Sequence, residues 1–167
     1  MPGRSLPEWL DYIERIHPKS IQLGLERVAK VRDVLGRSSS AARFTVAGTN
    51  GKGSTCAMLE AILLAAGYRV GVYTSPHLLR YNERVRLDGV PLSDARLCAA
   101  FETVERARAE ITLTYFEFGT LAAWEIFAAE ALDAVILEVG LGGRLDAVNA
   151  FDADCAAGGT RCPGRTS

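Results

Sequence analysis

The stretch Phe44-Thr-Val-Ala-Gly-Thr-Asn-Gly-Lys-Gly-Ser-Thr55 decides the fold. It starts as an apolar, β-branched segment and runs directly into a glycine-rich turn with a lysine followed by hydroxyl side chains. Gly48, Gly51 and Gly53 let the backbone curl with its N–H groups pointing inward, so that they form a nest for the oxygens of a polyphosphate. A strand that leads through such a turn into a helix predicts a phosphate-binding loop.

The side chains of this loop supply the rest of the chemistry. Lys52 offers a positive charge to the β- and γ-phosphates, and the hydroxyls of Ser54 and Thr55 lie at a helix N-terminus, which favours anions and Mg²⁺-bound phosphate. The match to the common G-x-x-x-x-G-K-[ST] pattern is imperfect, because Val46 stands at the first glycine and Gly53 follows the lysine. A glycine-rich turn that binds nothing is the alternative, and the strand-loop-helix context disfavours it.

The composition limits the classes of protein. With 167 residues, 49% of them hydrophobic, the chain is long enough for one core. A net charge of −1 gives no global field for nucleic acid or a membrane surface, so neither is an expected partner. Without a signal-peptide run or an apolar stretch near the roughly 20 residues that span a bilayer, a cytoplasmic location is expected. The cysteines form no zinc pattern; reduced thiols are expected, and Cys56 and Cys98 are interpreted as buried.

Hydrophobic periodicity predicts an α/β protein with a parallel sheet flanked by helices. The expected helices are 6–16, about Leu23–Leu35, Ser54–Ala66, Ser93 to about Glu110, and Gly119–Ala131, and the expected strands are Arg43–Ala47, Arg69–Tyr73 and Ala134–Val139. Thr74–Pro91 contains prolines, a glycine and mixed charges and is interpreted as an excursion outside the core. Within it, Glu83-Arg-Val-Arg86 is interpreted as a solvated charged stretch.

One acid follows a buried run. Glu138 comes directly after Val135-Ile-Leu137, where an ionised carboxylate is costly unless it pairs or binds a cation. A Mg²⁺ ligand beside the phosphate loop fits this position, and a structural salt bridge is the alternative. The polar segment Gly140–Asp146 follows at the carboxyl end of the strand, where open parallel sheets bind ligands.

Four ordered segments together resemble the bifunctional dihydrofolate synthase/folylpolyglutamate synthase family, which belongs to the Mur ligase superfamily. The resemblance extends from about Leu6 to about Ala156. It rests on Thr45-Val-Ala-Gly-Thr-Asn-Gly-Lys-Gly-Ser54, Tyr73-Thr-Ser-Pro-His77, Thr114-Tyr-Phe-Glu117 and Leu137-Glu-Val-Gly-Leu-Gly-Gly-Arg-Leu-Asp146. It implies a phosphate-loop-containing central ATPase domain of the Mur-ligase type, here incomplete.

The resemblance also implies roles for individual residues. Lys52 and Glu138 would be catalytic, and Ser75 and Glu138 would ligate Mg²⁺. The ATP phosphates would be bound by Gly48, Thr49, Asn50, Gly51, Lys52, Gly53 and Ser54. The substrate side of the site would be formed by Ser20, Ile21, Gln22, Leu23, Thr114, Tyr115, Phe116, Glu117, Arg144 and Asp146.

Some of these positions have a second interpretation. Gln22 occupies a position where an aspartate is expected in close relatives, which puts its hydrogen bond to a pterin in doubt. Tyr115 and Phe116 either stack on a pterin ring or belong to the core. His77 either orients the metal loop or lies at the surface, and it is not among the expected catalytic residues.

The implied activity is that of an ATP-dependent ligase of folate biosynthesis and one-carbon metabolism. Such an enzyme uses ATP and Mg²⁺ to convert the carboxylate of dihydropteroate or of a folate into an acyl phosphate, which the amine of L-glutamate attacks. No protein nucleophile is required, and the expected partners are these small molecules. The parent enzyme is expected to be monomeric.

The segment after Ala156 departs from the family. Ala157-Gly-Gly-Thr-Arg-Cys-Pro-Gly-Arg-Thr-Ser167 carries glycines, a proline and arginines and predicts no core strand. We therefore expect residues 1–156 to be the N-terminal part of the ATP-binding domain and 157–167 to be an unrelated, disordered tail.

The chain is hypothesised to be an inactive, truncated or frameshifted form without the C-terminal glutamate-ligase domain. The alternatives are a non-catalytic remnant that binds nucleotide and, against the pterin-side segments, a fragment of a cell-wall Mur ligase.

Overall fold

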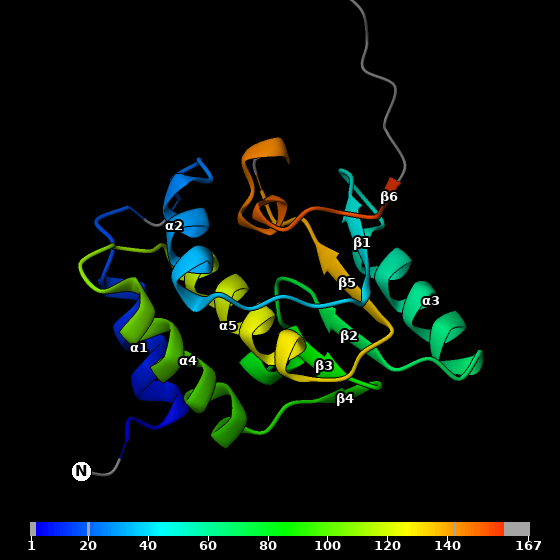
Figure 1. Ribbon diagram of the computed structural model, residues 1–167, viewed down its shortest axis with the longest axis horizontal. Coiled ribbons are helices and arrows are strands. Elements are labelled where there is room, and N and C mark those ends of the chain that lie inside the picture. Colours follow the sequence, from blue (N-terminus) through cyan, green and yellow to red (C-terminus); the bar gives the residue numbers. More distant parts are fainter. Residues whose placement is uncertain (1–2, 20, 142, 159–167) are drawn as a thin grey trace, which may run out of the picture.

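A six-stranded sheet organises the computed structural model, which describes residues 3–19, 21–141 and 143–158. The strand order is β4-β3-β2-β5-β1-β6 (Figure 1). The strands are β1 (Ala42–Ala47), β2 (Val70–Tyr73), β3 (Val85–Leu87), β4 (Val90–Pro91), β5 (Ala134–Glu138) and β6 (Cys155–Gly158).

The centre of the sheet is parallel, as the sequence predicts. β5 pairs in parallel with β1 on one side and β2 on the other, so that Ile136 lies between Phe44 and Val72. Every residue of β5 is buried, which explains its continuous run of apolar, mostly branched side chains.

The prediction that Thr74–Pro91 lies outside the core is wrong. β3 and β4 form an antiparallel hairpin, and β3 pairs with β2, so the sheet is mixed at this edge. The turn is made by Asp88 and Gly89, which have φ angles of 50° and 82°, the positive values that a two-residue hairpin turn requires. The strands are too short to show a clear alternation of apolar and polar residues, and the Asp-Gly pair is the signal that identifies the hairpin.

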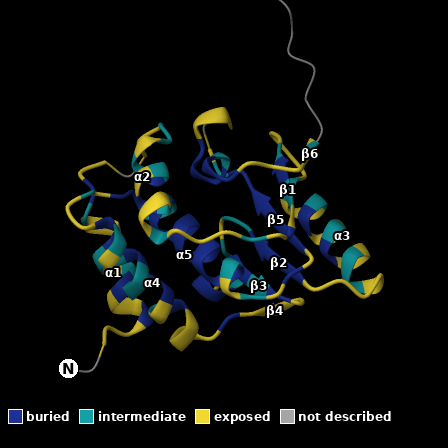
Figure 2. Ribbon diagram, viewed as in Figure 1, coloured by how far each residue is buried: buried dark blue, intermediate teal, exposed yellow. Residues whose placement is uncertain are grey.

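The helices cover the two faces of the sheet unequally. They are α1 (Leu6–Arg15), α2 (Glu26–Leu35), α3 (Lys52–Ala65), α4 (Asp94–Arg108) and α5 (Tyr115–Ala129). The main core joins α1, α2, α4 and α5 to one face, whereas a smaller cluster around Val46, Cys56 and Ile136 lies under α3 on the other (Figure 1). α5 is buried from Glu117 to Phe127 and forms the middle of the larger layer (Figure 2).

Two helices begin earlier than the sequence predicts. α3 starts at Lys52 instead of Ser54, and α5 starts at Tyr115 instead of Gly119. In α5 the cause is a capping box, because the backbone N–H of Thr114 donates to Glu117 Oε2 at 2.8 Å and the N–H of Glu117 donates to Thr114 Oγ1 at 3.2 Å. The predicted boundaries at Gly36 and Ser93 are confirmed, as the C-cap of α2 and the N-cap of α4.

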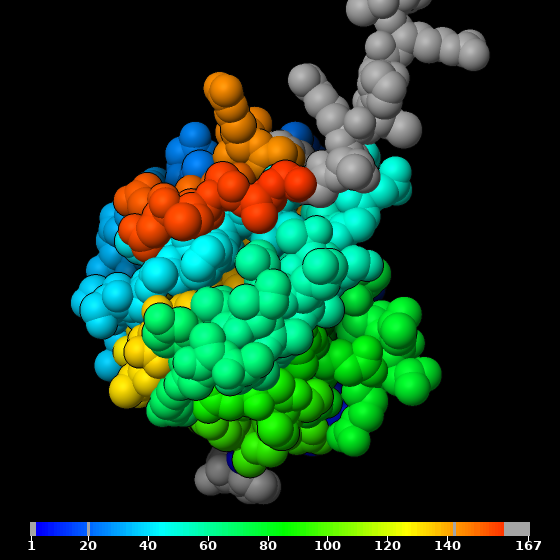
Figure 3. All heavy atoms as spheres, turned by 90° about the vertical axis from the view of Figure 1, so that its right-hand side faces the viewer, coloured from blue at the N-terminus to red at the C-terminus, as the bar shows by residue number. Residues whose placement is uncertain are grey.

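The predicted boundary at residue 156 falls inside a strand. β6 includes Ala157 and Gly158, which lie beside Val46 and Ala47 of β1. A parallel ladder needs only backbone donors and acceptors, and alanine and glycine supply these. The face that α3 covers is seen in Figure 3, with β6 in red along its upper edge. The rest of the predicted tail, 159–167, lies outside the described residues.

The cysteines of the described part are free thiols, as predicted. Cys56 is buried, but Cys98 is only half-buried at the edge of the main core, and Cys155 is exposed. Cys162 lies outside the described residues. Within the described ranges no helix is long and apolar enough to cross a membrane.

The close packing of α5 on the sheet predicts the effect of Gly71→Ala. A Cβ at position 71 would lie 2.8 Å from Leu132 Cδ1 and from Phe127 Cδ1, closer than real contacts allow. Overpacking of this kind costs about 1–3 kcal/mol of unfolding free energy, which urea denaturation measures. In Gly53→Ala the new Cβ meets nothing within 4 Å, so this control should keep its stability, and an equal loss in both variants would contradict the explanation.

Candidate functional site

A cleft of about 470 Å³ opens at the carboxyl ends of the parallel strands. The loops after β1, β2 and β5 meet there, together with the start of α5 and the segment before α2. The predicted site residues that line it are Ile21, Gln22, Leu23, Lys52, Ser75, Thr114, Tyr115, Phe116, Glu117 and Asp146. The fold thus gathers segments that are far apart in the sequence into one site.

The phosphate loop ends in the N-terminus of α3. Gly48 and Gly51 have φ angles of 150° and 76°, so both positions need glycine. Lys52 is the first residue of the helix, and its Nζ donates to the carbonyl of Gly48 at 3.1 Å, which folds the side chain back over the loop. The hydroxyl of Thr55 donates to Gly51 O at 2.9 Å, whereas Ser54 is exposed. Gly48, Thr49, Asn50 and Gly53 are exposed along the same turn.

Glu138 ends the central strand and is only 4% exposed. Its Oε2 accepts a 2.9 Å hydrogen bond from the backbone N–H of Ser75. No lysine or arginine of the described ranges forms an ion pair with it, so the structural salt bridge is not what compensates this carboxylate. A buried carboxylate without a cationic partner suits a metal ion.

The donor set around Glu138 fits Mg²⁺. The described residues contain no cluster of three or more His, Cys, Asp or Glu side chains that could hold a metal. Mg²⁺ is commonly held by one or two protein oxygens together with substrate phosphates and water, and it does not need such a cage. Ser75 and Glu138 would supply such oxygens, and Ser75 lines the cleft together with Lys52.

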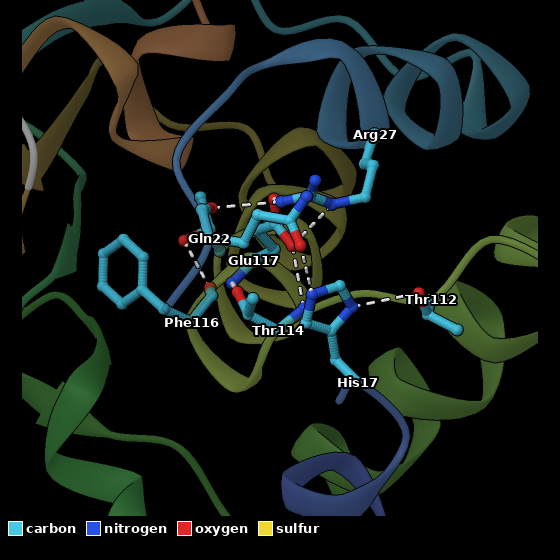
Figure 4. A network of polar contacts seen from close by, with 8 residues as sticks. His17, Gln22, Arg27, Thr112, Thr114, Phe116 and Glu117 are labelled. Carbon is cyan, nitrogen blue, oxygen red and sulfur yellow. Dashed lines mark hydrogen bonds and ion pairs between the residues drawn. The ribbon is translucent and has the colours of Figure 1, made fainter. Parts of the chain in front are cut away.

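Glu117 organises the opposite wall of the cleft (Figure 4). It is 3% exposed, and its Oε1 lies 2.6 Å from Nη2 of Arg27, which also donates to the carbonyl of Gln22 at 3.1 Å. The side-chain oxygen of Gln22 lies 2.8 Å from Nε2 of His17. Glu117 and His17 thereby fix the segment before α2 against the start of α5, a structural role that sequence reasoning missed. Ser20 lies outside the described residues.

The two aromatic residues of the same helix turn are partly buried and face the cleft. The ring of Phe116 lies 5.9 Å from that of Tyr73, and the ring of Tyr115 lies 6.0 Å from that of Tyr81. A Cβ at Gly140 would be 2.9 Å from Phe116 Cζ, so glycine lets this ring lie close to the chain. Both rings belong partly to the core and partly to the cleft wall, and stacking on a ligand stays a prediction.

Asp146 and Arg144 differ in their surroundings. Asp146 is 3% exposed, and its carboxylate accepts hydrogen bonds from the N–H groups of Leu141 at 2.8 Å and Val148 at 3.0 Å. Burial raises the pKa of Asp146, although these N–H groups and the charge of Lys52 oppose the shift. Arg144 is exposed and is not among the residues that line the cleft.

Arg84 is a cleft residue that sequence reasoning missed. It is 9% exposed, and its guanidinium carbon lies 5.5 Å from the ring centres of both Tyr81 and Tyr115. Its Nε donates to Nδ1 of His77 at 2.8 Å, and burial together with this cation lowers the pKa of His77. No carboxylate of the described part forms an ion pair with Arg84. The prediction that 83–86 is a solvated stretch is therefore wrong. β3 begins at Val85, and in this segment Arg84 and Val85 are buried while Glu83 and Arg86 are half-buried.

The chain is similar in sequence and in structure to proteins of one fold class. No protein-family model matches the chain. Its mostly parallel sheet, with a glycine-rich loop after β1 and an acid at the end of β5, is an α/β fold of the Mur-ligase type.

Within that class the chain is homologous to bifunctional dihydrofolate synthase/folylpolyglutamate synthase. The Escherichia coli (strain K12) protein is 59% identical over 152 residues, which cover 90% of this chain and 36% of the relative. The structure of E. coli FolC in complex with DHPP and ADP matches with a TM-score of 0.91 and 56% identity, over 95% of this chain and 39% of that one.

A bifunctional folylpolyglutamate synthase/dihydrofolate synthase with Mn, AMPPNP and L-glutamate bound matches with a TM-score of 0.87 and 58% identity, over 93% and 38% of the two chains. The chain thus spans little more than a third of the length of the relatives it matches.

The charge arrangement in the cleft predicts how Asp146 titrates. Because folding raises its pKa, the contribution of Asp146 to stability is fully present below the unfolded value of about 3.9 and is lost as the pH rises through the folded value. Lys52→Met removes an opposing positive charge and should raise the pKa of Asp146 further, as ¹³C NMR of the carboxyl groups would measure. Lys30→Met, at an exposed position of α2, should leave this pKa unchanged. An unchanged pKa in Lys52→Met would contradict the arrangement.

Proposed function

We propose that this chain is the ATP- and pterin-binding part of an ATP-dependent ligase that joins L-glutamate to dihydropteroate or to a folate. One observation carries the proposal: a single cleft is lined by Lys52 of the phosphate loop, Ser75 of the loop beside Glu138, and the aromatic start of α5. Similar structures that hold DHPP and ADP, or Mn, AMPPNP and L-glutamate, support it.

The proposed reaction explains why these residue types are needed. A carboxylate resists attack by an amine because its oxygen is a poor leaving group, so ATP first converts it into an acyl phosphate. The amine of L-glutamate then attacks the carbonyl carbon, phosphate leaves and an amide forms. In this scheme Lys52 neutralises phosphate charge, and the walls of the cleft hold the acid close to the phosphate loop.

The protein itself contributes no nucleophile in this scheme. Cys56 is the cysteine nearest in sequence to the phosphate loop, and burial raises its pKa to about 12, with the charge of Glu138 adding to the shift. The thiol therefore stays protonated at neutral pH.

Ser75 and Glu138 are the residues that would hold Mg²⁺. When bound, this ion neutralises the charge of the phosphoryl group that is transferred. The backbone N–H of Ser75 orients the carboxylate of Glu138, so the two positions act together.

The setting that we propose is the cytoplasm, with a monomeric parent enzyme and small molecules as its partners. The near-neutral charge of the chain supports the choice of small molecules as partners, because it gives no field that would attract a nucleic acid or a membrane surface.

A binding-only role is the second candidate for the chain itself. Ser75 and Glu138 are the two candidate metal ligands, and the part that the structure describes contains no group of three or more His, Cys, Asp or Glu side chains that could hold a metal. Release of ADP that depends on both dihydropteroate and L-glutamate would exclude the binding-only role, whereas nucleotide binding without such turnover would favour it.

Nucleotide affinity tests the phosphate loop and the metal site separately. Calorimetric titration with ADP should show binding that Mg²⁺ strengthens. Lys52→Ala should weaken ADP binding roughly tenfold to a hundredfold with and without the metal, because a charged hydrogen bond is lost. Glu138→Gln should remove only the effect of Mg²⁺. Lys30→Ala on the exposed surface of α2 is the control, and a loss in Lys30→Ala as large as in Lys52→Ala would refute the assignment.

The uncompensated cation at Arg84 predicts recognition of an acidic substrate. Arg84→Gln should weaken the binding of pteroate roughly tenfold and leave ADP affinity unchanged, because the substrate carboxylate loses a buried positive charge. Fluorescence titration of the pterin measures this. Arg80→Gln changes an arginine whose side chain is 72% exposed and should bind pteroate normally. Equal pteroate affinity in the wild type and Arg84→Gln would show that Arg84 does not face the ligand.

A further inference from the structure

We propose that Arg86, held by Glu60, is a positioning residue that fixes the Ser75 loop relative to the phosphate-loop helix and so couples metal binding to nucleotide binding. The inference rests on the proposed function of the cleft, and it adds two residues that do not line the cleft. The observation behind it is a continuous series of polar contacts from α3 to Glu138.

The first contact joins α3 to the sheet. Glu60 is 8% exposed, although it is a carboxylate on a helix that packs on an apolar cluster. Arg86 on β3 reaches it with Nε at 3.2 and 3.3 Å from the two carboxylate oxygens and with Nη2 at 2.8 Å from Oε2. This forked, mostly buried geometry fixes the direction of the guanidinium group.

The second contact joins the guanidinium group of Arg86 to the loop that contains Ser75. Nη1 of Arg86 donates to the hydroxyl of Thr74 at 3.3 Å and to the carbonyl of Glu83 at 3.1 Å. Thr74 also donates its backbone N–H to Arg84 O at 2.9 Å, so this residue is held from two sides.

The third contact ends at the metal position. The residue after Thr74 is Ser75, whose N–H donates to Glu138 Oε2 at 2.9 Å. At the other end of the series, Glu60 and Lys52 lie on the same helix, eight positions or about 12 Å apart along its axis. The phosphate-binding lysine and the two metal-site residues are thus connected through Arg86.

Stability alone does not account for this arrangement. A buried ion pair adds little net stability, because desolvation offsets most of the attraction, and apolar residues would fill the same space at least as well. The pair Glu60–Arg86 is also placed where it supplies a donor to Thr74, which an apolar pair would not do. Sites of this kind need their groups held to within about 0.5 Å, and supporting hydrogen bonds provide that precision.

Three variants separate positioning from stability. Thr74→Val removes the hydroxyl that accepts from Arg86 and keeps the shape of the side chain. The charge-swapped double variant, Glu60→Arg with Arg86→Glu, keeps an ion pair between α3 and β3 but removes the donor to Thr74. Arg96→Lys, in an ion pair between α4 and Glu130, is the control.

The first measurement needs no ligand. Hydrogen exchange followed by mass spectrometry should show roughly tenfold faster exchange at the amides of residues 74 and 75 in Thr74→Val and in the charge-swapped variant, with α3 unchanged. In Arg96→Lys these two amides should exchange as they do in the wild type. An unchanged exchange rate at residues 74 and 75 in Thr74→Val would overturn the inference.

The second measurement is the ratio of ADP affinities with and without Mn²⁺. In the wild type this ratio should exceed one. In Thr74→Val and in the charge-swapped variant the ratio should fall roughly tenfold, while the ADP affinity without metal stays constant. The thermal unfolding temperature of Thr74→Val should equal that of the wild type. A purely structural role of Arg86 would give the same unfolding temperature, so the ratio of affinities is the measurement that separates a positioning role from a structural one. A ratio that is unchanged while the loop exchanges faster would overturn the coupling.

Failure of the proposed function gives a different result. If the wild-type chain binds no ADP at all, the proposed nucleotide site is wrong for this chain. The inference that Arg86 positions the loop is then decided by hydrogen exchange alone.

Discussion

Burial of β5 between β1 and β2 is the constraint on which the rest of the structure depends. A parallel strand that is covered on both faces has to be apolar along its length, and its neighbours have to run in the same direction. Their carboxyl ends therefore meet at one edge, and the loops that follow them share one cleft. The carboxylate of Glu138 is tolerated at the end of β5 because it lies at this edge, where the N–H of Ser75 donates a hydrogen bond to it.

Helix α5 shows how one local signal serves both folding and the site. The capping box between Thr114 and Glu117 starts the helix, and the same Glu117 pairs with Arg27 and thereby holds the chain before α2. A residue that the sequence assigns to substrate binding, and that lines the cleft, thus also supports its neighbours. The cleft wall is formed by residues whose positions the capping box determines.

The sequence predicts the centre of this protein well, because strong periodicity and a glycine-rich turn act over short distances. The strands β1, β2 and β5, the phosphate loop and the acid Glu138 follow from residues that are close in the chain. The hairpin of β3 and β4 was missed because its strands are very short, and Cys98 was placed too deep because it lies at the margin of the core. Arg84 could not be identified, since only the packing of the hairpin against the start of α5 shows that this cation is buried without a carboxylate.

The buried guanidinium of Arg84 also has a thermodynamic consequence. A cation removed from water without an opposite charge makes the folded, ligand-free protein less stable than the same fold with a neutral residue there. An anionic ligand that pairs with Arg84 offsets this cost. Part of the binding free energy therefore comes from removing an unfavourable contribution that the free protein carries. Neutral substitutions of Arg84 should therefore raise the unfolding temperature of the free protein and weaken its binding of an anionic ligand. At this side chain, stability and recognition have opposite requirements.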